Sequence, residues 1–221
     1  MNHSAKWNGK QLSRQAGVSM IEVLVSLIIL MVGLLGLAGL MMHSQSSEME
    51  SYQRVQALIL LQDMAGRLNA NRNVASCYNF TTGTGGTSFI GAGSTNPPCI
   101  VGTAAQQTRF TDDMNAWRNA LIGVGETITG GNNVGAMIGA RGCISYNSAS
   151  ANNLVKDKNN ADIAGTGVYT IAVSWQGISK TFAPAPLSVP AMYCGTGQYT
   201  NENQRRIVSL TVRIGSVNNT I

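Results

Sequence analysis

The hydrophobic and polar positions follow three different patterns along the chain, and the first pattern is an unbroken apolar run. Residues 23–42 contain no charged side chain, and Glu22 stands directly before them. A helix of about 20 residues rises by about 30 Å, which matches the hydrocarbon core of a bilayer. We therefore predict that residues 18–43 form a membrane-spanning helix.

Beyond the apolar run, the same helix is expected to become amphipathic. Apolar side chains recur there at intervals of three and four residues, which places them on one face: Ala57, Leu61, Met64 and Leu68. On the polar side, Glu50 precedes Arg54 and Asp63 precedes Arg67 by four residues, the spacing of ion pairs on a helix. The Asn-rich residues 69–73 should end the helix. The stripe predicts that this half of the helix packs on a head domain.

The last third of the chain changes to the alternating pattern of β-strands. We predict strands over residues 143–146, 168–176 and 206–214. The two longer strands each turn four large side chains toward the core: Tyr169, Ile171, Val173 and Trp175, and Val208, Leu210, Val212 and Ile214. A long helix laid across a small antiparallel sheet is an α+β fold.

The charge of the chain is concentrated near its N-terminus. The formal net charge is +5, but Lys6, Lys10 and Arg14 precede the apolar run with no acid among them. The rest of the chain is close to neutral, so binding to nucleic acid through its phosphates is not indicated. Cations ahead of an apolar helix keep the N-terminus in the cytoplasm and send the residues after Met42 across the membrane.

The four cysteines lie in the part of the chain that is predicted to be exported. An even number of cysteines in an oxidising compartment indicates two disulfides, and three pairings are formally possible. Their wide spacing does not suit a zinc site. We predict a Cys77–Cys99 bond, which closes a flexible loop rich in Gly, Thr and Ser over residues 81–98. We also predict a Cys143–Cys194 bond, which ties the first strand to the loop before the last one.

A short motif connects the basic leader to the apolar run. Residues 17–22 read G-V-S-M-I-E, so that Gly17 ends the leader and Glu22 is the fifth residue after it. This resembles the class III leader and N-terminal helix of type IV prepilins and type II secretion pseudopilins, although the three residues between Gly17 and Ile21 differ from the usual Phe, Thr and Leu. The resemblance implies cleavage between Gly17 and Val18, after which the apolar helix stays with the mature protein.

The resemblance also implies roles for two residues of this motif. Val18 would carry the new amino terminus and be N-methylated, and Glu22 would pair with the N-terminal amine of a neighbouring subunit during assembly. An acid at the edge of a membrane is costly without a partner and is therefore usually functional. The implied organisation is a leader over residues 1–17, a membrane and assembly helix over 18–43 and a periplasmic head over 44–221, with a prepilin peptidase as the processing enzyme.

Four segments of the head resemble PilV-type minor pilins. They read D-D-M-N-A-W-R at residues 112–118, R-G-C-I at 141–144, V-S-W-Q at 173–176 and R-R-I-V-S-L-T-V in the last strand, with Cys194 before it. The resemblance implies the pilin fold and a structural subunit that primes or joins pilus assembly near the tip. Its implied partners are other minor and major pilins, the inner-membrane assembly machinery and a tip adhesin. The chain would lie in the bacterial inner membrane before it enters the extracellular pilus.

Two alternative functions share part of this pattern. A minor pseudopilin of a type II secretion system would carry the same leader motif, although two disulfides favour a pilus. A membrane-tethered adhesin or binding module would have the same anchor and a ligand site on its head. These alternatives stay open, because a leader motif does not distinguish among them.

Three glycines interrupt the apolar helix at intervals of three residues: Gly33, Gly36 and Gly39. Each costs up to about 1 kcal/mol of helix stability relative to Ala. Small residues of this kind allow helices to pack closely in lipid. They also weaken the helix, so that the segment could stretch or unwind inside a fibre. The two interpretations carry equal weight.

A short helix is predicted from Thr111 or Asp112 to Ile122. Asp112 and Asp113 would then lie in its first turn. Carboxylates at that position cap the helix and complement its dipole, which is a structural role rather than a catalytic or calcium-binding one.

The sequence contains no arrangement that is typical of an enzyme. Its histidines are His3, in the leader, and His43, beside the apolar run, so the head has no histidine for catalysis or metal binding. Asp157 and Asp162 do not form a calcium-binding loop. We therefore expect a non-enzymatic protein with no cofactor and no metal.

Two further pairs of head residues, two arginines and two tyrosines, could have structural roles. Arg205 and Arg206 are expected to solvate the start of the last strand. Tyr193 and Tyr199 could belong to a binding surface or fill the core, and the sequence does not separate these two possibilities.

Overall fold

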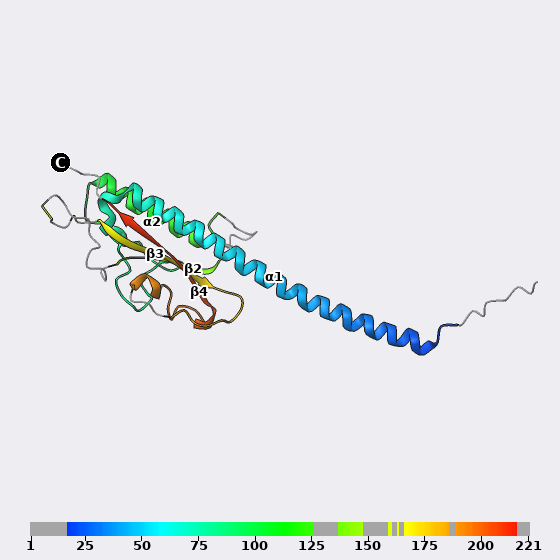
Figure 1. Cartoon of the computed structure of the whole chain (residues 1–221). Coiled ribbons are helices and arrows are strands. Elements are labelled where there is room, and N and C mark those ends of the chain that lie inside the picture. Colours follow the sequence, from blue (N-terminus) through cyan, green and yellow to red (C-terminus); the bar gives the residue numbers. More distant parts are fainter. Residues whose placement is uncertain are drawn as a thin grey trace, which may run out of the picture. The chain divides into compact units, whose positions relative to one another are not determined.

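The computed structural model describes residues 17–125, 137–147, 159–160, 163, 166–185 and 189–215. Its elements follow in the order α1 (Met20–Ala70), η1 (Arg72–Tyr78), β1 (Ile90–Gly91), α2 (Ala104–Leu121), β2 (Ile138–Tyr146), β3 (Gly167–Gln176), η2 (Pro190–Tyr193), η3 (Glu202–Gln204) and β4 (Arg205–Ile214) (Figure 1). The chain forms two compact units, Met1–Gln45 and Ser46–Ile221, and we call the second unit the head. The predicted leader lies outside the described residues, except for its last residue, Gly17.

The described part of the N-terminal unit is dominated by the first half of α1. Its side chains are exposed as far as Met42, so this apolar surface has no partner among the described residues. The one hydroxyl of the apolar run, that of Ser26, donates to the carbonyl of Val23 at 2.8 Å and is thereby satisfied within the helix. Among the described helices, α1 is long and apolar enough to cross a membrane, by length and composition.

In the head, the second half of α1 packs through the predicted stripe. The four predicted residues are fully buried, which confirms the stripe: Ala57, Leu61, Met64 and Leu68. Gln53 extends the stripe by one turn, and its Oε1 accepts a hydrogen bond from the indole N–H of Trp175 at 3.1 Å. The helix ends at Ala70, within the Asn-rich residues 69–73, as predicted.

The strands form one antiparallel sheet in the order β1-β2-β3-β4. In its centre Gly142 pairs with Val173, and Ile171 pairs with Leu210. This sheet and the long helix confirm the predicted α+β fold. The strand predicted over residues 143–146 is part of a longer β2, and β1 lies within a segment that was expected to be a loop.

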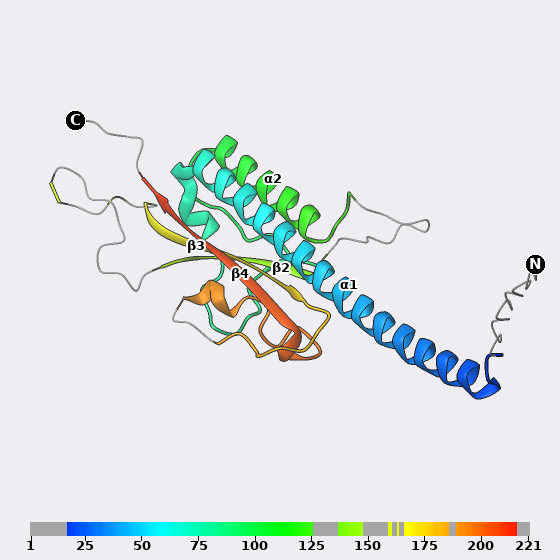
Figure 2. The same cartoon turned by 45° about the vertical axis from the view of Figure 1, so that its right-hand side comes forward.

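The two helices of the head lie side by side over one face of the sheet (Figure 2). The indole N–H of Trp117 in α2 donates to the carbonyl of Leu60 in α1 at 3.1 Å. The ring of Trp117 also covers Gly142 of β2, where an added Cβ would clash with it. A small residue at this point of the sheet therefore allows helix and sheet to approach closely.

The opposite face of the sheet is covered as well, although the middle of β3 turns only small side chains toward it: Thr170, Ala172 and Ser174. Ala172 packs there with the disulfide between Cys143 and Cys194 and with Ala191 of η2. The second disulfide joins Cys77 of η1 to Cys99, which lies shortly before α2. The two bonds therefore tie the sheet and η1 to segments that have little regular structure.

The helix that was predicted to start at Thr111 or Asp112 starts earlier, at Ala104. Its true N-cap is Thr103, whose hydroxyl accepts from the backbone N–H of Gln106, while the side chain of Gln106 accepts from the backbone N–H of Thr103. This capping box outweighs the two acids as a start signal, because it satisfies two N–H groups at once.

Candidate assembly site

The residues that the sequence singles out for processing and assembly surround the start of α1. Gly17 and Val18 precede the helix and are exposed, and the first turn closes through hydrogen bonds from the N–H groups of Glu22 and Val23 to the carbonyl of Ser19, at 3.0 and 3.3 Å. An enzyme that cuts between Gly17 and Val18 would therefore meet exposed backbone that precedes the helix.

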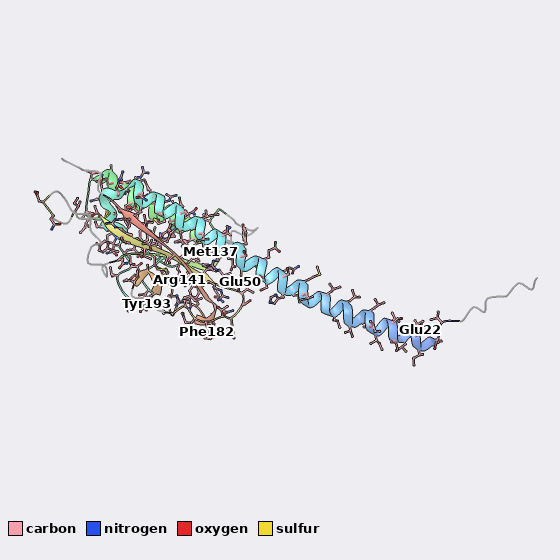
Figure 3. The ribbon with its side chains drawn as sticks, viewed as in Figure 1. Glu22, Glu50, Met137, Arg141, Phe182 and Tyr193 are labelled. Atoms are coloured by element: carbon pink, nitrogen blue, oxygen red, sulfur yellow. A yellow bond between two sulfur atoms is a disulfide. The ribbon has the colours of Figure 1, made fainter. Side chains whose placement is uncertain are left out.

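Glu22 lies in the first turn of α1 with its side chain exposed (Figure 3). A carboxylate there is favoured by the helix dipole, but only modestly. Within the described residues Glu22 forms no ion pair. The carboxylate therefore stands at the edge of the apolar run and is available to a group outside the chain.

The three glycines of the apolar run have no packing partner in the part of the chain that the structure describes. A Cβ added at Gly33, Gly36 or Gly39 would meet no other atom within 4 Å. The chain itself therefore gives no steric reason for glycine at these positions. A reason must lie in a partner helix or in the weakness of the helix, and both interpretations from the sequence remain predictions.

In the head, the two aspartates that were expected to cap a helix do not lie at a helix start. Asp112 and Asp113 lie in the middle of α2, so the predicted capping role is wrong. Asp113 is almost fully buried and accepts hydrogen bonds from the hydroxyl of Tyr78 at 2.6 Å and from Arg67 at 3.1 Å. Arg67 also pairs with Asp63 at 2.8 Å, which confirms that predicted ion pair.

This buried network joins α1, η1 and α2. Burial, together with the hydrogen bond to Asp113, raises the pKa of Tyr78 far above its ordinary value, so the phenol stays a proton donor. The side-chain amide of Asn71 donates to the Tyr78 oxygen at 3.3 Å and to the carbonyl of Gln106 at 3.1 Å. All the polar atoms named here have partners, which is typical of a structural network rather than of a catalytic one.

A second network lies where α1 meets the start of β4. Glu50 accepts from Arg206 at 3.0 Å and from the backbone N–H of Ser179 at 2.9 Å. Burial alone would raise the pKa of Glu50, but the hydrogen bond from Ser179 and the charge of Arg206 together outweigh it and lower that pKa. The predicted Glu50–Arg54 pair is therefore wrong, because Glu50 gains a less exposed cation and a backbone donor instead.

The two arginines that were expected to solvate the start of the last strand are both engaged. Arg205 is only 4% exposed; it pairs with Glu202 at 2.7 Å and donates to the carbonyl of Cys194. Arg206 pairs with Glu50 and donates to the carbonyl of Ser179. That prediction is wrong, because both guanidinium groups find acceptors within the head: Arg205 in nearby residues, and Arg206 in α1, which is distant in the sequence.

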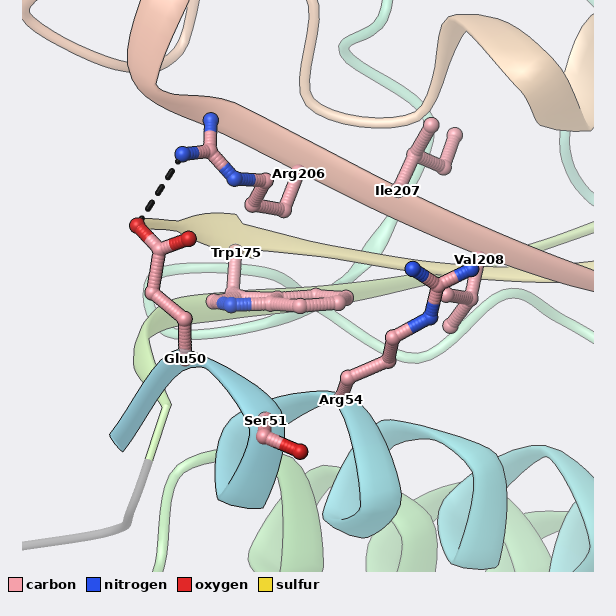
Figure 4. Close-up of a pocket in the computed structure, with 7 residues that line it drawn as sticks. All are labelled: Glu50, Ser51, Arg54, Trp175, Arg206, Ile207 and Val208. Atoms are coloured by element: carbon pink, nitrogen blue, oxygen red, sulfur yellow. Dashed lines mark hydrogen bonds and ion pairs between the residues drawn. The ribbon is translucent and has the colours of Figure 1, made fainter. Parts of the chain in front are cut away.

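Beside the Glu50–Arg206 pair, α1 and β4 border a partly open pocket of about 300 Å³ (Figure 4). Its walls combine apolar and charged side chains: Glu50, Ser51, Arg54, Trp175, Arg206, Ile207 and Val208. Arg54 reaches from α1 toward Val208 and forms no ion pair within the described residues. Among the described residues that line the pocket, Glu50 is the one carboxylate, and none is a histidine or a cysteine.

Tyr199 belongs to a packed cluster. Its hydroxyl lies 3.0 Å from that of Ser174 and donates to the carbonyl of Gly139 at 3.1 Å. The guanidinium of Arg141 lies over the rings of Tyr199 and Phe89, at 4.6 and 4.9 Å from their centroids. Burial raises the pKa of Tyr199 above its ordinary value. Tyr193 is half-buried in η2, so neither tyrosine forms an exposed aromatic surface.

In the part of the chain that the structure describes, no three His, Cys, Asp or Glu side chains come together as metal ligands. His43 is exposed, and His3, Asp157 and Asp162 lie outside the described residues. Sequence reasoning missed Gln53, and it named Arg141 only as part of a motif, without its contacts to Phe89 and Tyr199. Gln53 could have been found, because it stands four residues before Ala57 in the apolar stripe.

One family model matches the chain, over residues 12–38, and describes the prokaryotic N-terminal methylation motif. The matched segment contains Gly17, Val18 and Glu22 and runs into the apolar half of α1. No curated protein and no solved structure matches the chain. The motif is the prepilin signal of type IV pilins and pseudopilins, and it supports a pilin-like protein.

The motif has three further consequences. It points to a structural protein, and it implies assembly with other pilins after processing by a prepilin peptidase. Together with the long apolar helix it fits anchoring in the inner membrane.

Proposed function

We propose that the chain is a minor type IV pilin of the PilV type, which is cut between Gly17 and Val18 and primes or joins pilus assembly near the tip. The observation that carries the proposal is the methylation motif over residues 12–38, because it continues into a helix segment whose apolar side chains are all exposed. An apolar surface of this extent needs lipid or other helices around it. The apolar helix of a pilin lies in the bilayer before assembly and among neighbouring helices in the fibre.

The proposed assembly contact joins Glu22 to the methylated amine of Val18 in the neighbouring subunit. Two unit charges about 4 Å apart attract by about 1 kcal/mol in water and by about 4 kcal/mol at an effective dielectric constant near 20. Leaving either charge unpaired in apolar surroundings is costly, so the contact forms only when both partners are present. It would fix the axial offset between helices, which apolar packing alone leaves free to slide.

The glycines of the apolar run fit this proposal. Gly33, Gly36 and Gly39 have free space around them, which would let another helix approach the backbone closely. The same residues lower the helix propensity of the segment. Both properties are useful to a subunit that moves from lipid into a bundle of helices.

Support for the PilV-type role comes from the head. The segments R-G-C-I and V-S-W-Q, which carry the resemblance, lie on neighbouring strands, with Gly142 opposite Val173 and Cys143 opposite Ala172. The covering disulfide joins Cys143 to Cys194, which is a third part of the same resemblance. The segments are therefore parts of one local structure rather than scattered similarities.

A minor pseudopilin of a type II secretion system is the second candidate, because the same motif marks both classes. A membrane-tethered adhesin is the third, and the mixed pocket of Figure 4 is the described feature that favours it. A strain without this chain distinguishes the three. Loss of surface pili indicates a pilin, loss of secreted enzymes indicates a pseudopilin, and loss of surface attachment with normal pili and secretion indicates an adhesin.

The first test of the proposal is the mature N-terminus. Intact mass and N-terminal sequencing of the membrane-extracted protein should give a chain that starts at N-methylated Val18. A Gly17→Ala variant keeps the charge and the apolar run, so it controls for membrane insertion while it disturbs the cleavage site. A mature chain that starts at Met1, or that is cut beyond Met42, would refute the proposal.

A further inference from the structure

One end of the head displays exposed apolar side chains. Phe182 is 98% exposed, Ile138 is 58% exposed and Ile178 is 41% exposed. Single exposed apolar residues are ordinary on a protein surface. A phenylalanine that is almost completely exposed is less common. Its segment is also fixed to the head, so the exposure of the ring is a built feature of the surface.

The segment that carries Ile178 and Phe182, residues 177–182, is fixed by hydrogen bonds. Arg206 donates to the carbonyl of Ser179 and to the hydroxyl of Thr181, at 2.7 Å each. The N–H of Thr181 donates to the carbonyl of Asn203 at 2.7 Å, and the N–H of Gly177 to that of Gln204 at 2.8 Å.

The same segment is also held to α1, because Glu50 accepts from the N–H of Ser179 and from Arg206. The backbone groups of Gly177, Ser179 and Thr181 thus bond to the rest of the head. Its apolar side chains are held outward by a built structure and are not simply left over in a loose loop.

These apolar side chains gather at the end of the head where α1 enters it. Ile138 begins β2 and pairs with Gln176 at the end of β3, and Arg206 lies at the start of β4. Figure 3 shows Phe182 at the same end of the head as Glu50. We call Ile138, Ile178, Lys180 and Phe182 the entry rim.

The chain itself indicates what the entry rim meets. Glu50, which holds the rim segment, is only eight residues beyond Met42, the last residue of the apolar run. Eight residues rise by about 12 Å as a helix and span at most about 29 Å when fully extended. A bilayer that contains the apolar run therefore has its headgroup region within reach of the rim.

The chemistry of the rim suits such a surface. Aromatic and aliphatic side chains insert at the boundary between headgroups and acyl chains, and neighbouring cations attract anionic lipids. Lys180 is exposed between Ile178 and Phe182, and it forms no ion pair within the described residues.

We propose that the entry rim is a membrane-contact surface, which inserts Phe182 and Ile178 into an anionic bilayer and places Lys180 against its headgroups. The inference rests on the membrane anchoring in the proposed function, but it does not depend on the type of pilin. The contact holds the head against the bilayer while the chain waits for assembly, and it must be released when the subunit enters the fibre.

The test uses the full mature chain in lipid nanodiscs that hold one copy each. The bilayer contains phosphatidylethanolamine and phosphatidylglycerol with brominated acyl chains, which quench tryptophan on contact. Phe182→Trp places a probe at the rim, and its high exposure makes the substitution harmless to the core. Ile100→Trp is the matched control, because Ile100 is 87% exposed and follows Cys99, which is bonded to Cys77 beyond the end of α1.

We expect the emission added by Trp at position 182 to fall by about twofold or more in brominated relative to ordinary lipid. Trp at position 100 should show no such loss. Adding Lys180→Glu to the first variant should reduce the quenching, because it reverses the attraction to phosphatidylglycerol.

Retention in the nanodisc without quenching at position 182, or equal quenching at both positions, would overturn this inference alone. A mature chain that does not stay with the nanodiscs would refute the membrane anchoring and the inference with it. A second copy cannot explain quenching, because each disc holds one chain.

Discussion

At the scale of single residues, the head depends on a few polar side chains that lie among apolar ones. Asp113 is the clearest case, because its side chain is only 7% exposed and it links Tyr78 to Arg67. The sequence alone suggests a helix cap for this aspartate, since a helix predicted to start at Thr111 or Asp112 would place it in the first turn. Its buried position depends on η1 and α1, which are distant in the sequence. Local pattern cannot reveal such a role.

Replacing Asp113 by Ala should lower the free energy of unfolding of the head by about 3 kcal/mol, because it leaves the buried hydroxyl of Tyr78 without its acceptor and Arg67 without one partner. Urea unfolding of the mature chain in detergent, followed by the fluorescence of Trp117 and Trp175, measures this loss. Asp63→Ala is the matched control. It removes the other, more exposed partner of Arg67 and should cost about 0.5 kcal/mol. Equal losses in the two variants would show that the buried network does not matter.

At the scale of elements, hydrophobic periodicity predicts what lies inside, and long-range contacts decide the rest. The stripe of α1 and the alternation of β3 and β4 follow from spacing alone, because burial of one face requires it. The start of α2 was missed, because the prediction relied on the two adjacent acids and did not weigh the capping box of Thr103 and Gln106. The partner of Glu50 was also missed. It comes from β4, and no local rule places Arg206 beside a helix more than 150 residues earlier.

The Glu50–Arg206 contact makes the attachment of β4 to α1 dependent on pH. The pKa of Glu50 is lower in the folded head than its ordinary value of 4.5, so the contact contributes fully above that value. The contribution is lost as the pH falls through the lower, folded value. Between about pH 6 and pH 3, the wild type should therefore lose more stability than Glu50→Gln, in which position 50 does not titrate. Urea midpoints at each pH give the two curves.

Glu48→Gln provides the control for this measurement. Glu48 is exposed and forms no ion pair within the described residues, so this variant should follow the wild-type curve. If Glu50→Gln follows that curve as well, the contact has no energetic weight.

The two disulfides should differ in how much they stabilise the head. Chain entropy alone predicts about 3.4 kcal/mol for the bond between Cys77 and Cys99 and about 4.1 kcal/mol for that between Cys143 and Cys194, from sequence separations of 22 and 51 residues. The second bond is also buried against Ala172 and Ala191, so its loss leaves a cavity. The double Cys143→Ala, Cys194→Ala variant should thus unfold at lower urea than the double Cys77→Ala, Cys99→Ala variant. The reverse order would contradict this ranking.

At the scale of the whole molecule, the two units differ in where their apolar side chains lie. The head closes its apolar side chains into a core, whereas the described part of the N-terminal unit exposes its apolar side chains from Val18 to Met42. The sequence predicts this contrast, because an uninterrupted apolar run cannot be amphipathic. No other described residue of the chain covers that surface. The function of the molecule therefore depends on what surrounds it, which is first a bilayer and then, under our proposal, other pilins.

Glu22 is the residue through which this proposal can be tested most directly. Lipid and neighbouring helices are equally apolar, so burial alone does not favour the fibre over the membrane. A charge pair between Glu22 and the amine of Val18 in the next subunit would supply that preference, because both charges lose their water in the same step.

We therefore expect Glu22→Ala to be processed and inserted normally but to be absent from the complex with the other minor pilins. Glu22→Gln should fail in the same way, since it keeps the shape and loses the charge. Glu48→Ala, an exposed acid beyond the apolar run, should assemble like the wild type. Pull-down of the membrane-extracted complex and counts of surface pili measure both steps. Normal capture and normal piliation with Glu22→Ala would show that the carboxylate is only an interfacial acid and that some other contact selects the fibre.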